Sequence, residues 1–306
     1  MTIIEVEDLV KRYGDRTVVD RVSFTVEQGE IFGILGPNGA GKTTTVECIE
    51  ALRTPDSGRI RVCGLDPQRQ ENELRHLLGA QLQESELPDK LTVGETMELY
   101  SSFYRAPSDW RELLGTLNLI DKIDTRFQRL SGGQKQRLAI ALALLGDPRV
   151  AVLDELTTGL DPNARRDTWE LVESVRDRGV TILLVTHFME EAERLCDRLA
   201  VIDAGRVVAI DTPAGLVARV NDNQRIRFRL SGDFDPAVLT VLPEVTSAGR
   251  AGNQVVVTGT GDLLLAVTNA LARAQILAAD LRIEQASLED AFVALTGRPI
   301  DSEEND

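Results

Sequence analysis

The run GPNGAGKTT, residues 36–44, constrains the fold of this chain more than any other segment. It contains the pattern G-x-x-x-x-G-K-[ST], it follows the short apolar run IFGIL, and it precedes KTTTVECIEAL, which we expect to be helical. A strand, a glycine loop and a helix in this order bind nucleotide phosphates, because the glycines let backbone N–H groups close around phosphate oxygens. The predicted phosphate-binding residues are Gly36, Pro37, Asn38, Gly39, Ala40, Gly41, Lys42, Thr43 and Thr44.

Two side chains of this loop and two carboxylates downstream carry the predicted chemistry. Lys42 supplies a point charge for the β- and γ-phosphates, and Thr43 offers its hydroxyl to Mg²⁺. The apolar strand VAVLDE ends in Asp154, which can hold Mg²⁺ through water, and in Glu155, which faces the other way and can orient the attacking water as a general base. Two solvated carboxylates at a strand end are the alternative, and a preceding phosphate loop favours the catalytic interpretation.

A histidine ends the next apolar strand. His187 follows TILLVT, and a predicted helix from Asn163 to Arg178 separates this strand from VAVLD, which indicates a crossover and a parallel sheet. Ligand sites lie at the carboxyl ends of such strands, where an imidazole can donate a hydrogen bond to a γ-phosphate. A helix cap within VTHFMEE is equally compatible with these residues, so both interpretations stay open.

A second glycine turn, LSGGQKQR at residues 130–137, opens an apolar helix without a lysine in the position of Lys42. The set GPNGAGKTT, LSGGQKQR, VAVLDE, GLDP and VTH, in this order, resembles the nucleotide-binding subunit of an ATP-binding cassette (ABC) transporter over about residues 2–220. The resemblance implies an α/β P-loop NTPase fold of the ABC-ATPase type, with a mixed sheet core, an antiparallel β subdomain and an α-helical subdomain at about residues 84–135.

The resemblance also implies an ATPase that uses ATP and Mg²⁺ and works as a homodimer. In this family ATP lies between two cassettes, so the signature residues Ser131, Gly132, Gly133 and Gln134 would complete the site of a second copy. That role explains a glycine turn without its own lysine, since Lys42 of the other copy supplies the charge.

Further roles follow from the same resemblance. Tyr13 would stack on adenine, although a strand-edge aromatic is the alternative, and Gln83 would contact Mg²⁺ and the attacking water, with Gln81 as its competitor. Asp161, in TTGLDP, would communicate across the dimer. The family usually has Asp-Glu-Pro-Thr, whereas this chain has Leu156 in place of proline, which puts the rigidity of the loop in doubt because proline's fixed φ is lost.

The last third of the chain changes in texture. Residues 221–300 predict the order β-α-β-β-α-β, which is typical of a small α+β ferredoxin-like domain, with one helix starting at about Asp235. A final helix, SLEDAFVALTG, has Ser287 as its expected N-cap and ends at Gly297. We expect an accessory or regulatory domain, followed by a disordered tail at residues 301–306.

Composition bounds the partners. The net charge of -15 argues against a nucleic-acid surface, and the longest apolar run, LAIALALL, is too short to span a bilayer. With no leader recognised, we expect a cytoplasmic protein that is peripheral on the inner face of the membrane and acts on a separate permease. The whole pattern resembles daunorubicin-resistance-type exporters, which pair with an ABC-2-type multi-span permease, and the segment from Gln83 to Tyr104 would meet that permease.

Two other functions stay open from the sequence. One is a cassette ATPase that acts on nucleic acid or ribosomes, which the acidic balance disfavours. The other is a regulatory module that binds ATP with little turnover, against which Glu155 and His187 both speak. The transported substrate, whether drug, antibiotic, lipid or polysaccharide, is not encoded in any motif of this chain.

Overall fold

The computed structural model describes residues 1–81, 87–219, 224–231, 235–252, 254–284 and 286–300. It divides into two compact units, one of Met1–Pro213 with the chain from Ile300, the other of Ala214–Pro299. The break falls slightly before the boundary at residue 220 that the sequence predicted. No helix within the described ranges is both long enough and apolar enough to cross a membrane.

A six-stranded sheet forms the centre of the first unit, in the order β5-β6-β7-β3-β8-β9. All neighbours in it are parallel except β8 and β9, which form an antiparallel hairpin. Because β3, β6 and β7 are buried along their whole length, their sequences are continuous apolar runs rather than alternating ones. The strands are β3 (Ile31–Leu35), β5 (Leu78–Gln81), β6 (Val150–Asp154), β7 (Thr181–Thr186), β8 (Arg198–Asp203) and β9 (Arg206–Asp211).

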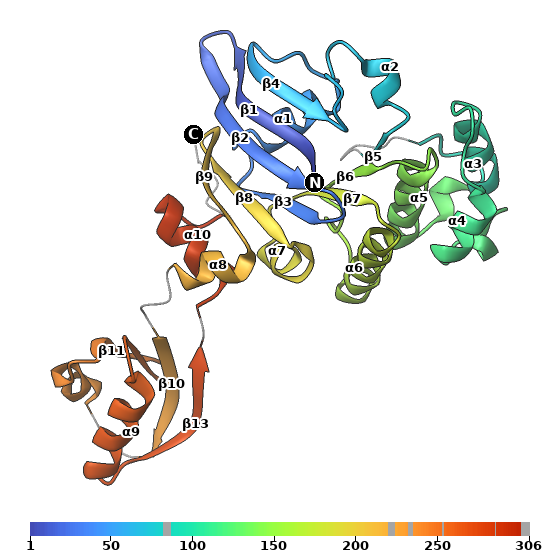
Figure 1. The fold of residues 1–306 in the computed structure, drawn as a ribbon. Coiled ribbons are helices and arrows are strands. Elements are labelled where there is room, and N and C mark those ends of the chain that lie inside the picture. The colour runs from blue at the N-terminus through green and yellow to red at the C-terminus, as the bar shows by residue number, and fades with distance from the viewer. Residues whose placement is uncertain (82–86, 220–223, 232–234, 253, 285, 301–306) are drawn as a thin grey trace. The chain divides into compact units, whose positions relative to one another are not determined.

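A second, antiparallel sheet covers helix α1 (Figure 1). Its order is β2-β1-β4, and one hydrophobic core joins it to the central sheet, with Phe24 stacked on Phe32 at 5.3 Å between ring centroids. The elements are β1 (Thr2–Tyr13), β2 (Arg16–Glu27), α1 (Lys42–Ile49), β4 (Ser57–Val62) and the short α2 (Glu71–Leu74).

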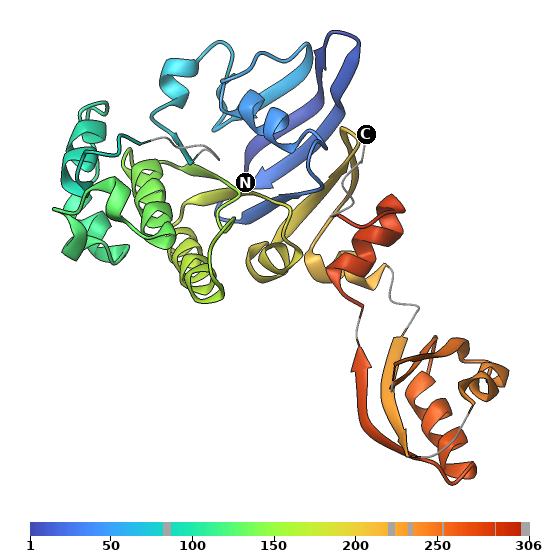
Figure 2. The same ribbon diagram turned by 180° about the vertical axis from the view of Figure 1, so that it is seen from behind.

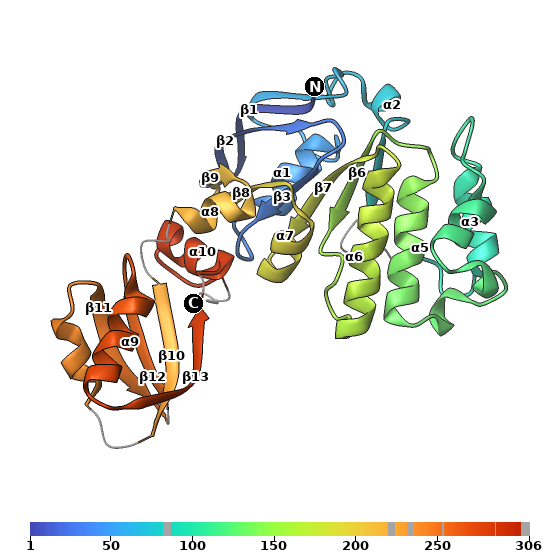
Figure 3. The same ribbon diagram turned by 60° about the horizontal axis from the view of Figure 1, so that its bottom comes forward.

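Helices occupy the other side of the central sheet. Helices α5 and α6 lie side by side (Figure 3), and α3 and α4 lie beyond α5, away from the antiparallel sheet (Figure 2). Helix α3 starts with a capping box between Thr92 and Glu95. The elements are α3 (Val93–Ser101), α4 (Trp110–Thr116), the 3₁₀ turns η1 (Ile120–Lys122) and η2 (Phe127–Arg129), α5 (Gly132–Leu144), α6 (Pro162–Asp177) and α7 (Met189–Leu195).

The second unit is built on a four-stranded antiparallel sheet in the order β11-β12-β10-β13. The core packs η3 and α9 against one face of this sheet around Ile226 and Phe228. The elements are α8 (Pro213–Ala218), β10 (Gln224–Ser231), η3 (Pro236–Val241), β11 (Val245–Ala251), β12 (Gln254–Gly259), α9 (Leu263–Arg273), β13 (Leu277–Glu284) and α10 (Leu288–Thr296).

Two predictions for this unit have different outcomes. The helix expected from about Asp235 is a 3₁₀ helix, because prolines at 236 and 243 bound a segment too short for a stable α-helix. Helix α10 is as predicted: Ser287 and Asp290 form a capping box, and Gly297 ends the helix with φ of 78°.

Candidate nucleotide-binding site

The glycine loop between β3 and α1 has the backbone that its sequence predicts. Gly39 and Gly41 have φ of 77° and 96°, in the left-handed region that favours glycine. A Cβ atom on Gly36 would lie 2.2 Å from the carbonyl oxygen of Ile202, and one on Gly41 would lie 2.5 Å from that of Val18. The loop is therefore held tightly from behind, while Asn38 and Gly39 at its tip are exposed.

Lys42 lies inside this loop. Its Nζ donates hydrogen bonds to the carbonyl oxygens of Gly36 at 2.8 Å and Pro37 at 2.9 Å, and the residue is 5% exposed. Burial lowers the pKa of Lys42, whereas the nearby carboxylates of Glu155 and Asp154 act in the opposite direction. An ammonium has three donors, so two carbonyl partners leave one donor for a phosphate oxygen.

Asp154, at the end of β6, is the second charged group beside the loop. It is 5% exposed, and its Oδ1 has no hydrogen-bond partner within the described part of the chain. Burial and the neighbouring Glu155 raise the pKa of Asp154 to about 6, against the effect of Lys42. A buried polar atom without a partner is costly, so a cation or a water here would stabilise the site. Asp154 and the exposed Thr43 hydroxyl at the start of α1 therefore fit a magnesium ion.

Glu155 and His187 come from neighbouring strand ends and meet. Glu155 Oε1 lies 3.2 Å from His187 Nδ1, and the backbone N–H of Glu155 donates to the carbonyl of Val185 at 2.9 Å. Strand β6 ends at Asp154, so the φ of 50° at Glu155, rather than strand alternation, sets the direction of this side chain. The alternative role of His187 as a helix cap is wrong, since the N-cap of α7 is Phe188.

The loop after Glu155 is anchored without the family's proline. Leu156 is completely buried, and short-range backbone hydrogen bonds join Thr158 to Glu155 and Leu160 to Thr157. Burial of the Leu156 side chain thus restricts the conformation of the loop, as the fixed φ of a proline would otherwise do.

The LSGGQ turn has Ser131 and Gly132 exposed, and its hydrogen bonds close within the turn. Ser131 caps α5 in a reciprocal capping box with Gln134: Ser131 Oγ accepts from Gln134 N at 3.3 Å, and Gln134 Oε1 accepts from Ser131 N at 3.0 Å. A Cβ on Gly133 would lie 3.3 Å from Cβ of Ala164, and one on Gly132 would lie 3.4 Å from Leu160. The turn therefore packs closely against the start of α6.

The remaining predicted residues have different surroundings. Asp161 is the N-cap of α6, with Oδ1 accepting from the N–H of Asn163 at 3.0 Å and of Ala164 at 3.1 Å. Tyr13 is 42% exposed, with Lys11 Nζ 5.7 Å and the Arg53 guanidinium 5.5 Å from its ring centroid. Gln83 lies outside the described residues, whereas its competitor Gln81 is the last residue of β5 and is 5% exposed.

Two buried carboxyl groups near this site were not anticipated. Glu50, at the end of α1, is 8% exposed, and neither carboxyl oxygen has a hydrogen-bond partner among the residues that the structure describes. Burial, with smaller contributions from Asp154 and Glu47, raises the pKa of Glu50 to about 8. Glu191 on α7 is completely buried. An acidic residue inside the apolar run CIEAL is the only sequence signal for Glu50.

Comparisons with known proteins identify the family. A family model described as "ABC transporter" matches residues 19–158. Nod factor export ATP-binding protein I of Ralstonia nicotianae is 39% identical over 97% of this chain and 94% of its own length. The chain belongs to the ABC transporter ATP-binding proteins. This cassette is also 38% identical to daunorubicin resistance ATP-binding protein DrrA3 of Streptomyces coeruleorubidus, over 97% of the cassette chain and 96% of the relative.

Solved structures confirm the P-loop ABC ATPase fold of the cassette. An ATP-binding subunit of an ABC transporter aligns with a TM-score of 0.64 at 31% identity, covering 71% of this chain and 92% of that chain. The ATP-binding cassette MJ0796, in a dimeric post-hydrolysis state bound to ADP and Pi, aligns with a TM-score of 0.61 at 27% identity, covering 69% of this chain and 98% of that one. ATP binding and hydrolysis are thus the activities of this family of chains.

Proposed function

We propose that this cassette hydrolyses ATP to drive export through a separate membrane permease. The observation that carries the proposal is the convergence of Glu155 and His187, at 3.2 Å, beside the buried Lys42 and the magnesium-compatible Asp154. This arrangement holds a general base, a phosphate-binding cation and a metal-binding carboxylate at one edge of a parallel sheet, as in-line attack of water on a phosphate requires.

Each residue has a defined task in this proposal. The loop of residues 36–44 and Lys42 bind the phosphates, and Glu155 orients the attacking water and accepts its proton. His187 has Nδ1 toward Glu155, which leaves Nε2 as the ring nitrogen that would face the γ-phosphate. Thr43, Asp154 and Gln83 would hold magnesium, which would supply positive charge against the phosphate oxygens. Tyr13 stacks on adenine, which its exposed ring allows.

We infer that two copies share each nucleotide. Ser131 and Gly132 of the signature turn are exposed at the N-terminus of α5, a position that suits the γ-phosphate held by the other copy. Asp161, next to it, lies on the loop that would communicate across the dimer. Glu155→Gln should trap an ATP-bound dimer, because the variant binds ATP but lacks the base. Size-exclusion chromatography with saturating ATP tests this, and a strictly monomeric variant that binds ATP would contradict the shared site.

The permease partner is proposed to be a multi-span protein of the ABC-2 type. The names of the two relatives, Nod factor export and daunorubicin resistance, support export, possible cargoes being a drug, an antibiotic or a lipid-like molecule. The segment from Gln83 to Tyr104 is the proposed docking region, where Leu99 and Phe103 are 44% and 66% exposed. Such a cassette would be cytoplasmic and peripheral on the inner face of the membrane.

We infer that the second unit is an accessory domain of the ferredoxin-like class. Its strand order, β11-β12-β10-β13, supports this, because the two middle strands are the first and third strands of a β-α-β-β-α-β series. The 3₁₀ helix η3 takes the place of the first helix. No nucleic-acid role is proposed for it.

The test compares two lysine variants in a membrane system with the permease. Lys42→Ala should abolish ATP-dependent activity, whereas Lys122→Ala, outside both the phosphate loop and the proposed docking segment, should not change it. Normal turnover by Lys42→Ala would refute the phosphate site. Affinity purification from membranes should recover a multi-span permease, and recovery of ribosomes or DNA in its place would overturn the transport proposal.

A further inference from the structure

Glu191 is a buried acid that the proposed chemistry does not use. It lies on α7 with 0% exposure, and its Oε1 accepts a hydrogen bond from the indole Nε1 of Trp169, on α6, at 3.3 Å. The hydroxyls of Thr186 and Thr157 lie close enough to lower its pKa, but burial has the larger effect and raises the pKa overall. Glu191 Oε2 and the Thr157 hydroxyl have no hydrogen-bond partner within the described residues.

Each neighbour of Glu191 belongs to a segment that carries a site residue. Thr157 follows Glu155 by two positions, and Thr186 is the last residue of β7, directly before His187. Trp169 is on α6, the helix that Asp161 caps. The Glu191 carboxyl group therefore accepts a hydrogen bond from the helix of the dimer loop and lies near both the loop of the general base and the strand end of the histidine.

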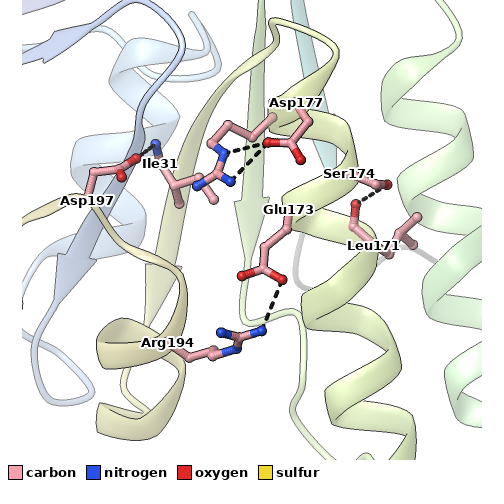
Figure 4. Close-up of polar contacts among 8 residues, drawn as sticks. Ile31, Leu171, Glu173, Ser174, Asp177, Arg194 and Asp197 are labelled. Carbon is pink, nitrogen blue, oxygen red and sulfur yellow. Dashed lines mark hydrogen bonds and ion pairs between the residues drawn. The ribbon is translucent and has the colours of Figure 1, made fainter.

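Other contacts join the same helices. Glu173 on α6 pairs with Arg194 on α7 at 3.2 Å (Figure 4). The Arg165 guanidinium lies 5.1 Å from the ring centroid of Phe188, whose ring lies 4.0 Å from that of His187. Helix α6 thus contacts the last turn of α7 through Glu173, and it contacts Phe188, the neighbour of His187, through Arg165.

The first turn of α6, which holds Arg165, also contacts the signature turn. The Cβ of Ala164, in this first turn, lies 3.3 Å from the position that a Cβ on Gly133 would take. Since the signature is proposed to serve the nucleotide of the second copy, α6 links the chain's own site to the half-site that it offers to its partner.

A carboxyl group at this buried position lowers the stability of the fold relative to an apolar side chain. Burying a polar group with one atom unpaired costs free energy, and an apolar side chain of similar shape would avoid that cost. Packing alone therefore does not account for Glu191. A role in holding neighbouring segments through directional polar contacts does account for it.

We propose that Glu191 is a positioning residue that holds the Glu155 loop and the His187 strand end in register against α6, and so against the signature turn. The inference rests on the proposed ATPase function. It predicts that loss of this carboxyl group lowers turnover while ATP binding by the glycine loop persists. Within the described residues, Lys42 donates to the carbonyls of Gly36 and Pro37, whereas Glu191 accepts from Trp169.

The kinetic test compares three variants of the full chain with its permease. Glu191→Leu should lower kcat about tenfold to a hundredfold with little change in KM, since small displacements of reacting groups have effects of that size. Glu191→Gln should restore at least half of the activity, because an amide keeps the shape and the acceptor for the Trp169 indole. Glu190→Gln, a charge change at the exposed neighbouring residue, should match the wild type.

A spectroscopic test reports on the anchor directly. Trp110→Phe leaves Trp169 as the only tryptophan, since the chain has two. In that background ATP should change the Trp169 emission, and adding Glu191→Leu should abolish the change while ATP still binds. Thermal melting shows whether Glu191→Leu is weakly active because it folds poorly. In that case the emission response of Trp169 still tests the contact with Glu191.

Two results separate the inference from the function on which it rests. A wild-type chain that binds and hydrolyses ATP, together with a Glu191→Leu variant of equal kcat and equal emission response, overturns the role of Glu191 alone. A wild-type chain without ATP hydrolysis in the presence of its permease overturns the proposed function itself.

Discussion

Glu50 offers the sharpest test of the electrostatics beneath the phosphate loop. We predict that Glu50→Gln stabilises the protein at pH 8 and has much less effect at pH 5. The carboxyl is 8% exposed with both oxygens unpaired within the described residues, and burial raises its pKa from 4.5 to about 8. An amide of the same shape has no proton to lose and carries no such penalty.

The magnitude follows from proton linkage. Below pH 4.5 the folded and unfolded chains both hold the proton on Glu50, so the penalty is absent. Between 4.5 and about 8 the unfolded chain releases it while the folded chain keeps it, so the wild type loses stability as the pH rises. At about 1.4 kcal/mol for each pH unit, the full penalty is about 5 kcal/mol, and water entry into a real interior reduces it, so we expect about 2 kcal/mol or more.

Urea unfolding followed by circular dichroism at pH 5 and pH 8 measures this difference. Glu71→Gln is the control, because Glu71 also lies on a helix and pairs with Arg75 near the surface, but it does not contribute to the raised pKa of Glu50. It should change stability little, and to the same extent at both pH values. A Glu50→Gln variant whose advantage over the wild type does not grow from pH 5 to pH 8 would refute the reasoning.

Two further predictions concern the signature and the loop after the base. Ser131→Ala removes the acceptor of the capping box, so the melting temperature should fall by the equivalent of about 1 kcal/mol and ATPase activity should fall more steeply; unchanged turnover would argue against a phosphate role for this hydroxyl. Leu156→Ala empties a completely buried position, so unfolding free energy measured in urea should fall by about 2–5 kcal/mol; a neutral result would mean that the loop is not anchored by this side chain.

The strand and loop pattern of the first unit was predictable because its signals are local. Gly39 and Gly41 have the positive φ values that a glycine-rich turn indicates, and buried parallel strands such as β3 read as uninterrupted apolar runs. The hairpin of β8 and β9 and the capping box of α10 likewise depend on a few residues that are adjacent in the sequence.

Features that depend on distant partners were not predictable. The 3₁₀ helix after Asp235 is a separate case, since its cause is local: prolines at 236 and 243 leave too few residues for α-helical turns. The φ of 50° at Glu155 depends on its hydrogen bond to Val185, on another strand. Nothing in the sequence beside Glu191 marks it as buried, because its environment comes from α6 and from the end of β7.

The closed capping box of the signature turn has a kinetic consequence. Ser131 and Gln134 satisfy one another within a single chain, so this half-site is already folded before a second copy arrives. If each nucleotide needs such a turn from another chain, then turnover per molecule in dilute solution rises with protein concentration. A permease that holds two cassettes side by side raises their effective local concentration and removes that dependence. The membrane partner would then act first by bringing two cassettes together. In its presence the rate of ATP hydrolysis would be first order in the concentration of the complex.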